Sequence, residues 1–335
     1  ALIYGYSDGP FNIQSPKQLG TLLFEKLGLP AGKKTKTGYS TNADVLEKLK
    51  DKHPIIPAIM DYRMLTKLKG TYADGLMKVI GPDGRIHTTF QNLVTATGRL
   101  SSTDPNLQNI PVRTDLGAEI RKMFVPKPGC VLVDADYSQI ELRLLAHLSG
   151  DEHLVAAFNS GADFHAATAA RVFGVPVDEV TPQLRSRAKA VNFGIVYGQQ
   201  AYGLATSLKI PRAEAQEMID RYFDAYPGVR AYLDESVRLA HERGWATTMY
   251  GRKRHIKEFR QKNKQLIAFG ERTAMNHPMQ GTAADIIKIA MVQVERRLRE
   301  KGLASRLVLQ IHDELDLEVP VGELEAASEL VRSTM

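Results

Sequence analysis

The sequence predicts an α+β fold in which distant segments assemble one sheet and a long helical insertion separates them. Residues 130–137 form an apolar run that ends in two aspartates, which is typical of a strand. Residues 306–320 alternate apolar and polar side chains on both sides of His312-Asp313-Glu314, which predicts two strands and a tight turn. Between about 151 and 240 the apolar spacing is mostly helical.

Helices are also predicted near the N-terminus. Ser15-Pro16 is a helix start, because Ser can cap the helix and Pro suits its first turn. Two further helices are expected over 43–50 and 54–77, where leucine, isoleucine and tyrosine recur at helical spacing. The loop before them is interpreted as a solvated turn, with a phosphate contact as the alternative. Its lysines are Lys33, Lys34 and Lys36.

The remaining elements follow from turn residues and periodicity. Hairpins are predicted over 79–90, around Pro82-Asp83-Gly84, and over 245–259, which has a basic end. Helices are predicted over 139–148 and over about 265–299.

Composition limits the class of protein. The 335 residues are enough for two or three packed units, and 43% hydrophobic with 24% charged residues is an ordinary soluble balance. A net charge of +6 permits binding to a polyanion, provided that the charge gathers on one face. The single cysteine, Cys130, excludes an internal disulfide framework and any site with several cysteines, and we expect it to be buried. No signal-peptide pattern and no run of 18 apolar residues occurs, so a soluble intracellular protein is expected.

Two strand ends carry carboxylates, one near Asp136 and one at Asp313-Glu314. Either could be a turn in water, which suits aspartate. Two such ends in one chain favour a shared cation site, because Mg²⁺ binds a few carboxylates and completes its shell with water or substrate phosphate. The spacing does not choose between Asp134 and Asp136, which share a face of an extended strand.

A cationic stripe is predicted on one helix. Arg185, Lys189, Phe193 and Tyr197 are four residues apart and therefore lie on one face. Two cations followed by two aromatic rings suit a triphosphate with an attached base, whereas the alternative is a basic surface turn that leads into a buried aromatic end. Alone, His165 is interpreted as a structural histidine.

With these features, the sequence resembles the family A DNA polymerases. The resemblance is carried by "DYSQIELR" (136–143), "RSRAKAVNFGIVYG" (185–198) and "QIHDEL" (310–315), with further blocks at 95–113 and 275–288. It implies a right-hand polymerase fold with an antiparallel palm sheet, helical fingers and a partial helical thumb. The implied ranges are thumb 1–75, palm 76–148 and 263–335, and fingers 149–262.

The resemblance also implies an activity. The expected reaction is template-directed DNA synthesis, which adds deoxyribonucleotides to a primer 3′-hydroxyl by two-metal-ion phosphoryl transfer and releases pyrophosphate. The expected enzyme is a bacterial-type replication and repair polymerase, a monomer of the cytoplasm and nucleoid or of an organelle, without a membrane partner. Its implied partners are primer–template DNA and deoxyribonucleoside triphosphates, and its implied cofactors are two Mg²⁺ ions, with Mn²⁺ as a substitute.

The family motifs imply a role for each matching residue. The metal ligands would be Asp136, the Tyr137 carbonyl and Asp313, with Glu314 and Lys189 as further catalytic groups. Glu141 would reject a ribose 2′-hydroxyl by a clash. The full nucleotide set is Arg185, Lys189, Phe193, Tyr197, His165, Glu141 and Gln139. The DNA set is Arg99, Asn106, Arg272, Asn276, Gln280 and His312, several of them at the minor groove, where readout is nearly independent of sequence.

Three other functions remain open: a catalytically weak DNA-binding fragment, an enzyme like the single-subunit RNA polymerases, and a metal-dependent phosphohydrolase. The chain begins inside the thumb-like region and stops before the family's last palm strand, so we expect a fragment. The segment "GRKRHIKEF" (251–259) departs from the family form at Lys253, Ile256 and Lys257, which we interpret as a surface change.

Overall fold

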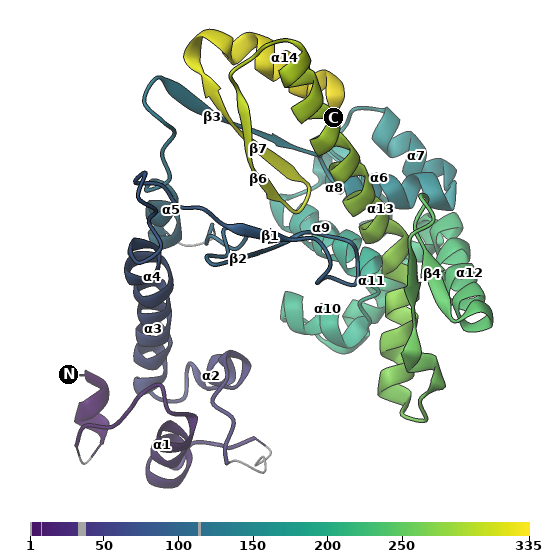
Figure 1. Ribbon diagram of the computed structural model, residues 1–335. Helices are drawn as coiled ribbons and strands as arrows, with labels where there is room; N and C mark the ends of the chain where they lie inside the picture. Colours follow the sequence, from purple (N-terminus) through teal and green to yellow (C-terminus); the bar gives the residue numbers. More distant parts are fainter. Residues whose placement is uncertain (1, 8, 33–37, 113–114) are drawn as a thin grey trace. The chain divides into compact units, whose positions relative to one another are not determined.

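The computed structural model describes residues 2–7, 9–32, 38–112 and 115–335 (Figure 1). Its residues form two compact units, one of residues 1–89 and 104–124 and the other of residues 90–103 and 125–335. The predicted lysine turn at Lys33, Lys34 and Lys36 lies outside the described residues. Within the described part of the chain, no helix is both long enough and apolar enough to cross a membrane.

The first unit is helical. Ser15 caps its first α-helix and Asn42 caps the second, in each case by accepting a backbone N–H bond. The buried faces meet in a core around Leu19, Leu23 and Ile56. The elements are η1 (Leu2–Tyr6), α1 (Pro16–Gly20), η2 (Thr21–Lys26), α2 (Ala43–Leu49), α3 (Ile55–Leu68), η3 (Lys69–Ala73), α4 (Asp74–Met77) and α5 (Asp115–Arg121).

The hairpin predicted over 79–90 is mostly a turn. It contains one antiparallel bridge, between Ile80 and Ile86, and Gly81 N donates to the Arg85 carbonyl at 2.7 Å. Regular pairing begins only afterwards, where β1 (Thr89–Gln91) meets β2 (Ser101–Thr103). The predicted second strand therefore continues past the turn and pairs with a later segment.

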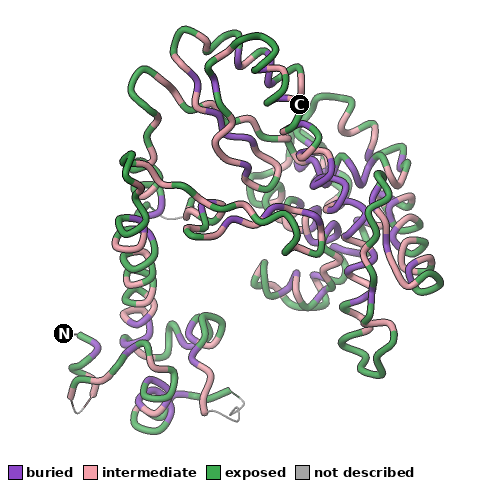
Figure 2. Tube along the Cα trace, in the orientation of Figure 1, coloured by how far each residue is buried: buried purple, intermediate pink, exposed green. Residues whose placement is uncertain are grey.

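The second unit contains the predicted sheet of distant segments. Its strands β3 (Cys130–Asp136), β6 (Arg306–Ile311) and β7 (Glu314–Pro320) are antiparallel in the order β3-β7-β6. Helices α13 (Lys264–Glu300) and α14 (Leu324–Thr334), the latter preceded by η6 (Val321–Glu323), pack against the sheet (Figure 1). Leu315, Leu317 and Val319 of the central strand are fully buried. Figure 2 shows buried segments along the strands of this sheet. Cys130 is only partly buried, contrary to expectation, because it begins an edge strand.

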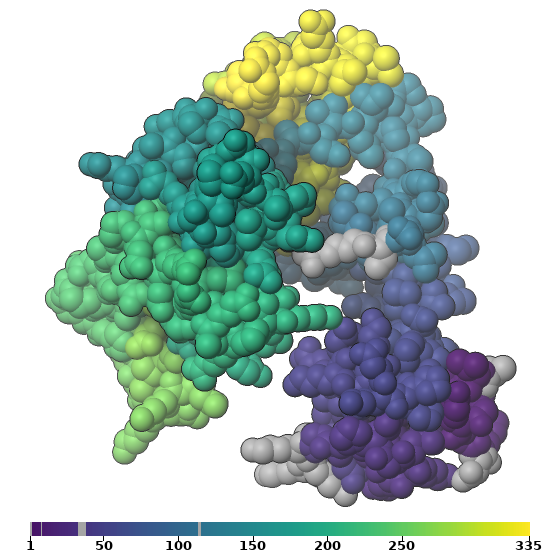
Figure 3. Space-filling model, turned by 180° about the vertical axis from the view of Figure 1, so that it is seen from behind, coloured from purple at the N-terminus to yellow at the C-terminus, as the bar shows by residue number. Residues whose placement is uncertain are grey.

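A helical insertion lies between β3 and α13, as predicted. Asp151, Asp163 and Thr181 cap three of its helices through side-chain oxygens. Its teal and green segments form one continuous surface in Figure 3, and its core includes the fully buried Tyr222 and Tyr226. The elements are α6 (Ile140–Ser149), α7 (Glu152–Asn159), α8 (Phe164–Phe173), η4 (Val177–Glu179), α9 (Pro182–Val196), α10 (Ala201–Leu208), α11 (Arg212–Ala225) and α12 (Pro227–Arg243).

A short hairpin of β4 (Trp245–Thr247) and β5 (Lys253–His255), followed by η5 (Lys257–Arg260), leads into α13. The interpretation of this segment as a surface change is wrong for one residue. Ile256 is 2% exposed and packs in a small core with Ala246 and Ala274, whereas Lys253 and Lys257 face solvent.

Candidate functional site

The pairing of β3 with β7 brings the two acidic strand ends together. Asp136 lies opposite Glu314, and Asp134 lies opposite Asp316. Because cross-strand partners project from the same face of a sheet, and residues two apart share that face, all four carboxylates belong to one face. The alternate residues, such as Leu315, turn into the core behind it.

Two backbone turns shape the edge of this acidic face. Tyr137 N donates to the Asp313 carbonyl at 3.1 Å, which joins the end of β3 to the turn between β6 and β7. His312 adopts a left-handed backbone with φ 59° at that turn, and Gln139 does so with φ 57° where α6 begins. The side-chain oxygen Oε1 of Gln139 is buried without a hydrogen-bond partner in the described part of the chain.

The carboxylates of this face raise one another's pKa. Burial raises the pKa of Asp136 to about 6, and the charges of Asp313 and Glu314 add to the effect. Burial, followed by the nearby Glu314 and Asp134, raises the pKa of Asp316 to about 8. These shifts mean that the face binds either protons or a cation more readily than isolated carboxylates do.

The acidic face fits a hard divalent cation. One oxygen each from Asp134, Glu314 and Asp316 lies within 4.8 Å of the others. Asp316 is 8% exposed, and its Oδ1 is buried without a hydrogen-bond partner among the described residues. Carboxylate oxygens at this spacing are the ligands that Mg²⁺, Mn²⁺ and Ca²⁺ prefer. Sequence reasoning did not select Asp316; its one signal was the acid placed between Leu315 and Leu317.

A second buried carboxylate, Glu141, joins several predicted site residues. It is 6% exposed, and Arg99 Nη2 lies 2.6 Å from its Oε1. The side chains of Tyr197 and Gln280 also hydrogen-bond to it. Burial raises the pKa of Glu141 despite the opposing charge of Arg99, and burial beside Glu141 raises the pKa of Tyr197 to about 12. Two predicted nucleotide residues and two predicted DNA residues thus meet at one carboxylate.

The segment that carries Arg99 is held by residues that sequence reasoning missed. Gly98 has φ 89°, and a Cβ there would lie 2.7 Å from Arg252 Nε, so only glycine fits without displacing that side chain. Arg252 in turn donates from Nε to Asp285 Oδ1 at 2.8 Å, and Thr248 donates to Oδ2 of the same carboxylate. Asp285 lies in the block at 275–288, but no role was predicted for it, because its partners are distant in sequence.

The predicted cationic stripe lies on α9. Arg185 donates from Nε to Asp163 Oδ2 at 2.6 Å, and Asp163 also caps α8. The rings of Phe193 and Tyr197 are stacked with centroids 6.5 Å apart. Asp163 was not predicted as a site residue, although its position as a helix cap was the available signal.

His165 lies beside this stripe. Its ring centroid is 5.9 Å from that of Phe193, and the residue is 3% exposed. Burial lowers the pKa of His165, and the charges of Arg185 and Lys189 lower it further. The neutral imidazole is therefore the favoured form at neutral pH.

The other predicted DNA residues occupy different places. Asn276 on α13 donates from Nδ2 to the Val196 carbonyl at 3.2 Å, at the end of α9. Arg272 packs against Gly198, where a Cβ would lie 3.1 Å from its Cγ. Burial and the charge of Arg99 lower the pKa of His312, which places this residue near the Glu141 group. Asn106 belongs to the first unit, where its Oδ1 accepts from Gln108 N at 2.9 Å.

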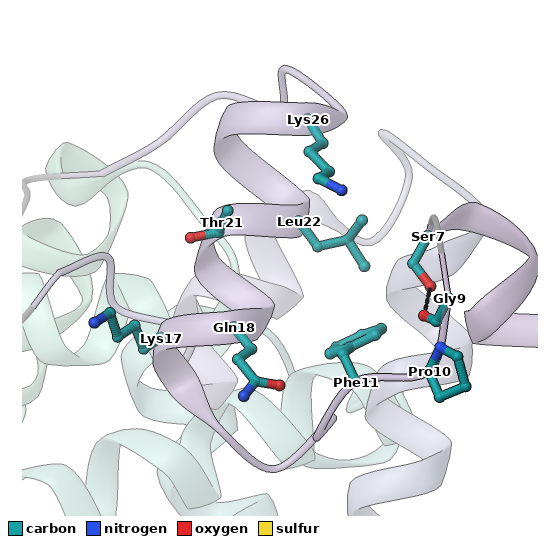
Figure 4. A pocket seen from close by; sticks show the side chains of 9 residues that line it. All are labelled: Ser7, Gly9, Pro10, Phe11, Lys17, Gln18, Thr21, Leu22 and Lys26. Atoms are coloured by element: carbon teal, nitrogen blue, oxygen red, sulfur yellow. Dashed lines mark hydrogen bonds between the residues drawn. The ribbon is translucent and has the colours of Figure 1, made fainter.

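Two hollows are lined by residues other than those of the acidic face. One, of about 350 Å³, is bordered by the ends of α9 and α10 and by α11, α12 and α13, and includes Arg212, Arg230 and Arg272. The other, of about 580 Å³, is in the first unit, where Leu22 and Lys26 project toward the segment of Ser7 and Gly9, whereas Lys17 points away from it (Figure 4). Arg272 is the one predicted site residue in either lining.

Comparisons with known proteins agree over nearly the whole chain. The family model for DNA polymerase family A matches residues 1–335. The DNA polymerase I of Caldicellulosiruptor bescii is 56% identical over 334 residues, which are 99% of this chain and 39% of that protein. The DNA polymerase I of Bacillus subtilis is 54% identical over 335 residues, 99% of this chain and 38% of that protein. The chain thus spans about two fifths of these relatives.

A solved structure is also similar. It is the POL domain of Pol1 from M. smegmatis in complex with DNA primer-template and dNTP, with a TM-score of 0.93 and 49% identity. The match covers 99% of this chain and 59% of that one. This likeness confirms the predicted α+β polymerase fold.

Proposed function

The chain belongs to DNA polymerase family A, and from this premise we propose that it performs template-directed DNA synthesis. In the proposed reaction a primer 3′-hydroxyl attacks the α-phosphorus of a deoxyribonucleoside triphosphate, and pyrophosphate leaves. The partners would be primer–template DNA and deoxyribonucleotides, which are also bound in the similar M. smegmatis structure.

The observation that carries this proposal is the pairing of β3 with β7. It places Asp136 opposite Glu314 and beside the Asp313 turn, although 176 residues of chain lie between Asp136 and Asp313. Three acids at one strand end are unfavourable without a bound cation or proton. A phosphoryl-transfer site provides a use for that arrangement.

The metal would be held by Asp136, Asp313 and the carbonyl of Tyr137, with Glu314 beside them. Two divalent cations, Mg²⁺ with Mn²⁺ as a substitute, would supply activation of the attacking hydroxyl and neutralisation of the charge on the leaving phosphates. The chain's own part is to keep these carboxylates fixed on a sheet edge that is backed by a packed core.

The triphosphate would bind along α9. Arg185 and Lys189 would hold its phosphates with His165 assisting, and Lys189 would give a proton to the leaving pyrophosphate. Phe193 would pack against the base and sugar, and Tyr197 would lie near the templating base. Gln139, with its unpartnered Oε1, would contact the nucleotide from the start of α6.

Glu141 would exclude ribonucleotides. It is buried and fixed by Arg99, so it forms a rigid wall that a 2′-hydroxyl would meet. The minor groove at the primer end would be contacted by Arg99, Asn276 and Gln280. For this contact Arg99 would give up part of its ion pair with Glu141 and bond to the DNA instead. The remaining duplex contacts would come from Arg272, Asn106 and His312.

The domain ranges, the oligomeric state and the location are likewise proposed from membership of the family. Residues 1–75 would be the thumb, 76–148 and 263–335 the palm, and 149–262 the fingers. The whole protein would act as a monomer in replication and repair in the bacterial cytoplasm, at the nucleoid.

Primer extension tests the proposal. The chain is incubated with a primer–template and Mg²⁺, with either deoxyribonucleotides or ribonucleotides, and Asp313→Ala is compared in parallel. Deoxyribonucleotide extension that is lost in Asp313→Ala, while DNA binding is retained, supports the proposal.

Each alternative has its own result in the same assay. Preferred ribonucleotide extension indicates an RNA polymerase. DNA binding without extension by the unaltered chain indicates a binding fragment. Cleavage of DNA without added nucleotides indicates a phosphohydrolase.

A further inference from the structure

A buried asparagine links the cationic helix to the helix that carries His165. Asn192 on α9 is fully buried, with 0% exposure. Its Nδ2 lies 3.1 Å from His165 Nδ1 and 3.2 Å from Thr168 Oγ1, both on α8. Its Oδ1 is buried without a partner among the described residues. An unpartnered amide oxygen costs stability, so this side chain requires an explanation other than packing.

The Thr168 hydroxyl determines which way the amide faces. Thr168 Oγ1 donates its single proton to the Phe164 carbonyl at 3.0 Å. It is therefore an acceptor toward its other neighbours, and Tyr226 also donates to it, at 3.5 Å. The Asn192 atom that faces Thr168 must then be the donor Nδ2, because the flipped amide would place two acceptors together.

The amide orientation in turn determines the proton on the imidazole. The same Nδ2 faces His165 Nδ1, and an amide nitrogen can only donate, so Nδ1 must be an acceptor. A neutral imidazole whose Nδ1 accepts carries its proton on Nε2. Burial and the charges of Arg185 and Lys189 also hold the pKa of His165 low, which disfavours a proton on both nitrogens.

We propose that Asn192 is a positioning residue that holds His165 as the neutral tautomer protonated at Nε2, so that His165 contacts a nucleotide phosphate as an uncharged donor. Among the described residues, none hydrogen-bonds to Nε2, which leaves that N–H for a ligand. The opposite tautomer would direct a lone pair toward a phosphate oxygen and repel it. The inference rests on the proposed nucleotide site but concerns a property of the free protein.

The first test observes the tautomer directly. Histidine labelled with ¹⁵N is examined by NMR at pH 7 in the free chain, and the His165 signal is assigned from its loss in His165→Gln. We expect an unprotonated Nδ1 and a protonated Nε2. In Asn192→Asp a carboxylate replaces the donor, so we expect a proton on Nδ1.

A second variant and an internal reference accompany this test. Thr168→Val removes the acceptor that orients the amide, and it should give a mixture of the two tautomers. His277 is also fully buried, and its Nε2 lies 3.2 Å from the Arg252 carbonyl, so its signals should stay unchanged in all variants. A wild-type His165 that is protonated at Nδ1, or cationic at pH 7, overturns the proposal. So does an unchanged tautomer in Asn192→Asp.

The second test measures binding of inorganic tripolyphosphate between pH 6 and 8. Asn192→Leu should weaken binding about tenfold, because one hydrogen bond to a charged ligand loses its orientation. In a His165→Gln background, where the glutamine amide is itself a donor, Asn192→Leu should have no further effect. An equal loss in both backgrounds contradicts action through His165. If the tautomer is as stated while no primer is extended, the positioning stands and the proposed polymerase activity fails.

Discussion

The acidic face on β3 and β7 differs from the cationic stripe on α9 in how its charges are compensated. On the stripe Arg185 bonds to Asp163, and beside it His165 is held by Asn192. On the acidic face, carboxylates face carboxylates, and the pKa of Asp136 and of Asp316 is raised. The cationic stripe is therefore compensated by partners within the folded chain, whereas the acidic face requires a cation or protons from solution.

This difference follows from how the two regions are built. A helix places residues four apart on one face, so a stripe and its caps form from local sequence. The acidic face exists only once distant strands pair, and each carboxylate then loses water near others of like charge. The stability of the acidic face therefore depends on its ligand, because a bound cation offsets the repulsion between carboxylates that folding brings together.

The largest expected effect comes from breaking the acidic face at Asp136. Asp136→Asn should lower kcat/KM for primer extension by at least about 10³-fold, as loss of a preorganised charge in a phosphoryl-transfer site does. Single-turnover extension at saturating Mg²⁺ measures this, and circular dichroism checks that the variant is folded. The matched control is Asp134→Asn on the same face of the strand, which should lose less than about tenfold.

This pair of variants also decides which oxygens hold the metal. The resemblance selects Asp136 and Asp313, whereas the grouping of oxygens within 4.8 Å consists of Asp134, Glu314 and Asp316. Equal losses in Asp134→Asn and Asp136→Asn would contradict the assignment of Asp136 and Asp313 as the metal ligands. They would instead support a cation held beside Asp316.

Sequence reasoning was most successful where the relevant contacts are local or repeat with a fixed period. The alternation around His312-Asp313-Glu314 predicted two strands and a turn, which are β6 and β7. The four-residue spacing predicted the stripe from Arg185 to Tyr197 on one helix, α9 with its C-terminal cap. In both cases the periodicity of the side chains carries the structural information.

The features that were not predicted depend on contacts between residues distant in sequence, which the periodicity of apolar residues does not show. Alternation shows which face a residue occupies but not which strand lies beside it, so the contact of Asp316 with Asp134 was not predicted. No role was predicted for Asn192, because its partner His165 is 27 residues away in the sequence. Ile256 was interpreted as a surface change, because the neighbouring sequence gives no sign of the small core that it forms with Ala246 and Ala274.

A second prediction concerns Glu141, a buried carboxylate near the site that has an internal cation. Arg99→Met leaves Glu141 buried without its ion partner, which should destabilise the second unit by about 3 kcal/mol. The double variant Arg99→Met with Glu141→Gln removes the charge and should recover most of that loss. Urea unfolding followed by fluorescence of Trp245, the one tryptophan of the chain, measures both. Equal stability of the single and double variants contradicts the assignment of a buried charge.

A third prediction examines the prearranged stripe with two arginines from one helix. Arg185 pairs with Asp163, and Arg187 pairs with Glu214, with arginine side chains 45% and 41% exposed. Arg185→Ala should reduce kcat/KM for nucleotide incorporation by roughly 10²-fold, because a charge-assisted phosphate contact is lost. Arg187→Ala removes an equally exposed ion pair and should change it by less than about threefold. Similar losses in both would mean that the stripe acts only through helix stability.

The smallest expected effect is the pH dependence of stability in the acidic face. In the folded chain the pKa of Asp136 is about 6 and that of Asp316 is about 8, both raised from 3.8. The folded state therefore binds these protons more tightly than the unfolded state. The stability contributed by Asp136 falls as pH rises from about 4 to about 6, and that contributed by Asp316 falls from about 4 to about 8. Each group changes the free energy of unfolding by at most ~1.4 kcal/mol per pH unit, and partial exposure of Asp136 together with sharing of protons reduces the sum to about 1–2 kcal/mol.

A divalent cation should reverse this trend, because it replaces the protons between the carboxylates and binds the folded state alone. Urea unfolding followed by Trp245 fluorescence at pH 5 and pH 8, without metal and with Mg²⁺ or Ca²⁺, measures both slopes. Asp316→Asn should flatten the metal-free slope, since it removes the carboxyl with the higher pKa, whereas Glu325→Gln on the exposed side of α14 should leave it unchanged. A metal-free stability that rises between pH 5 and pH 8 would mean that the carboxylates already have compensating charges, and the contrast with the stripe on α9 would disappear.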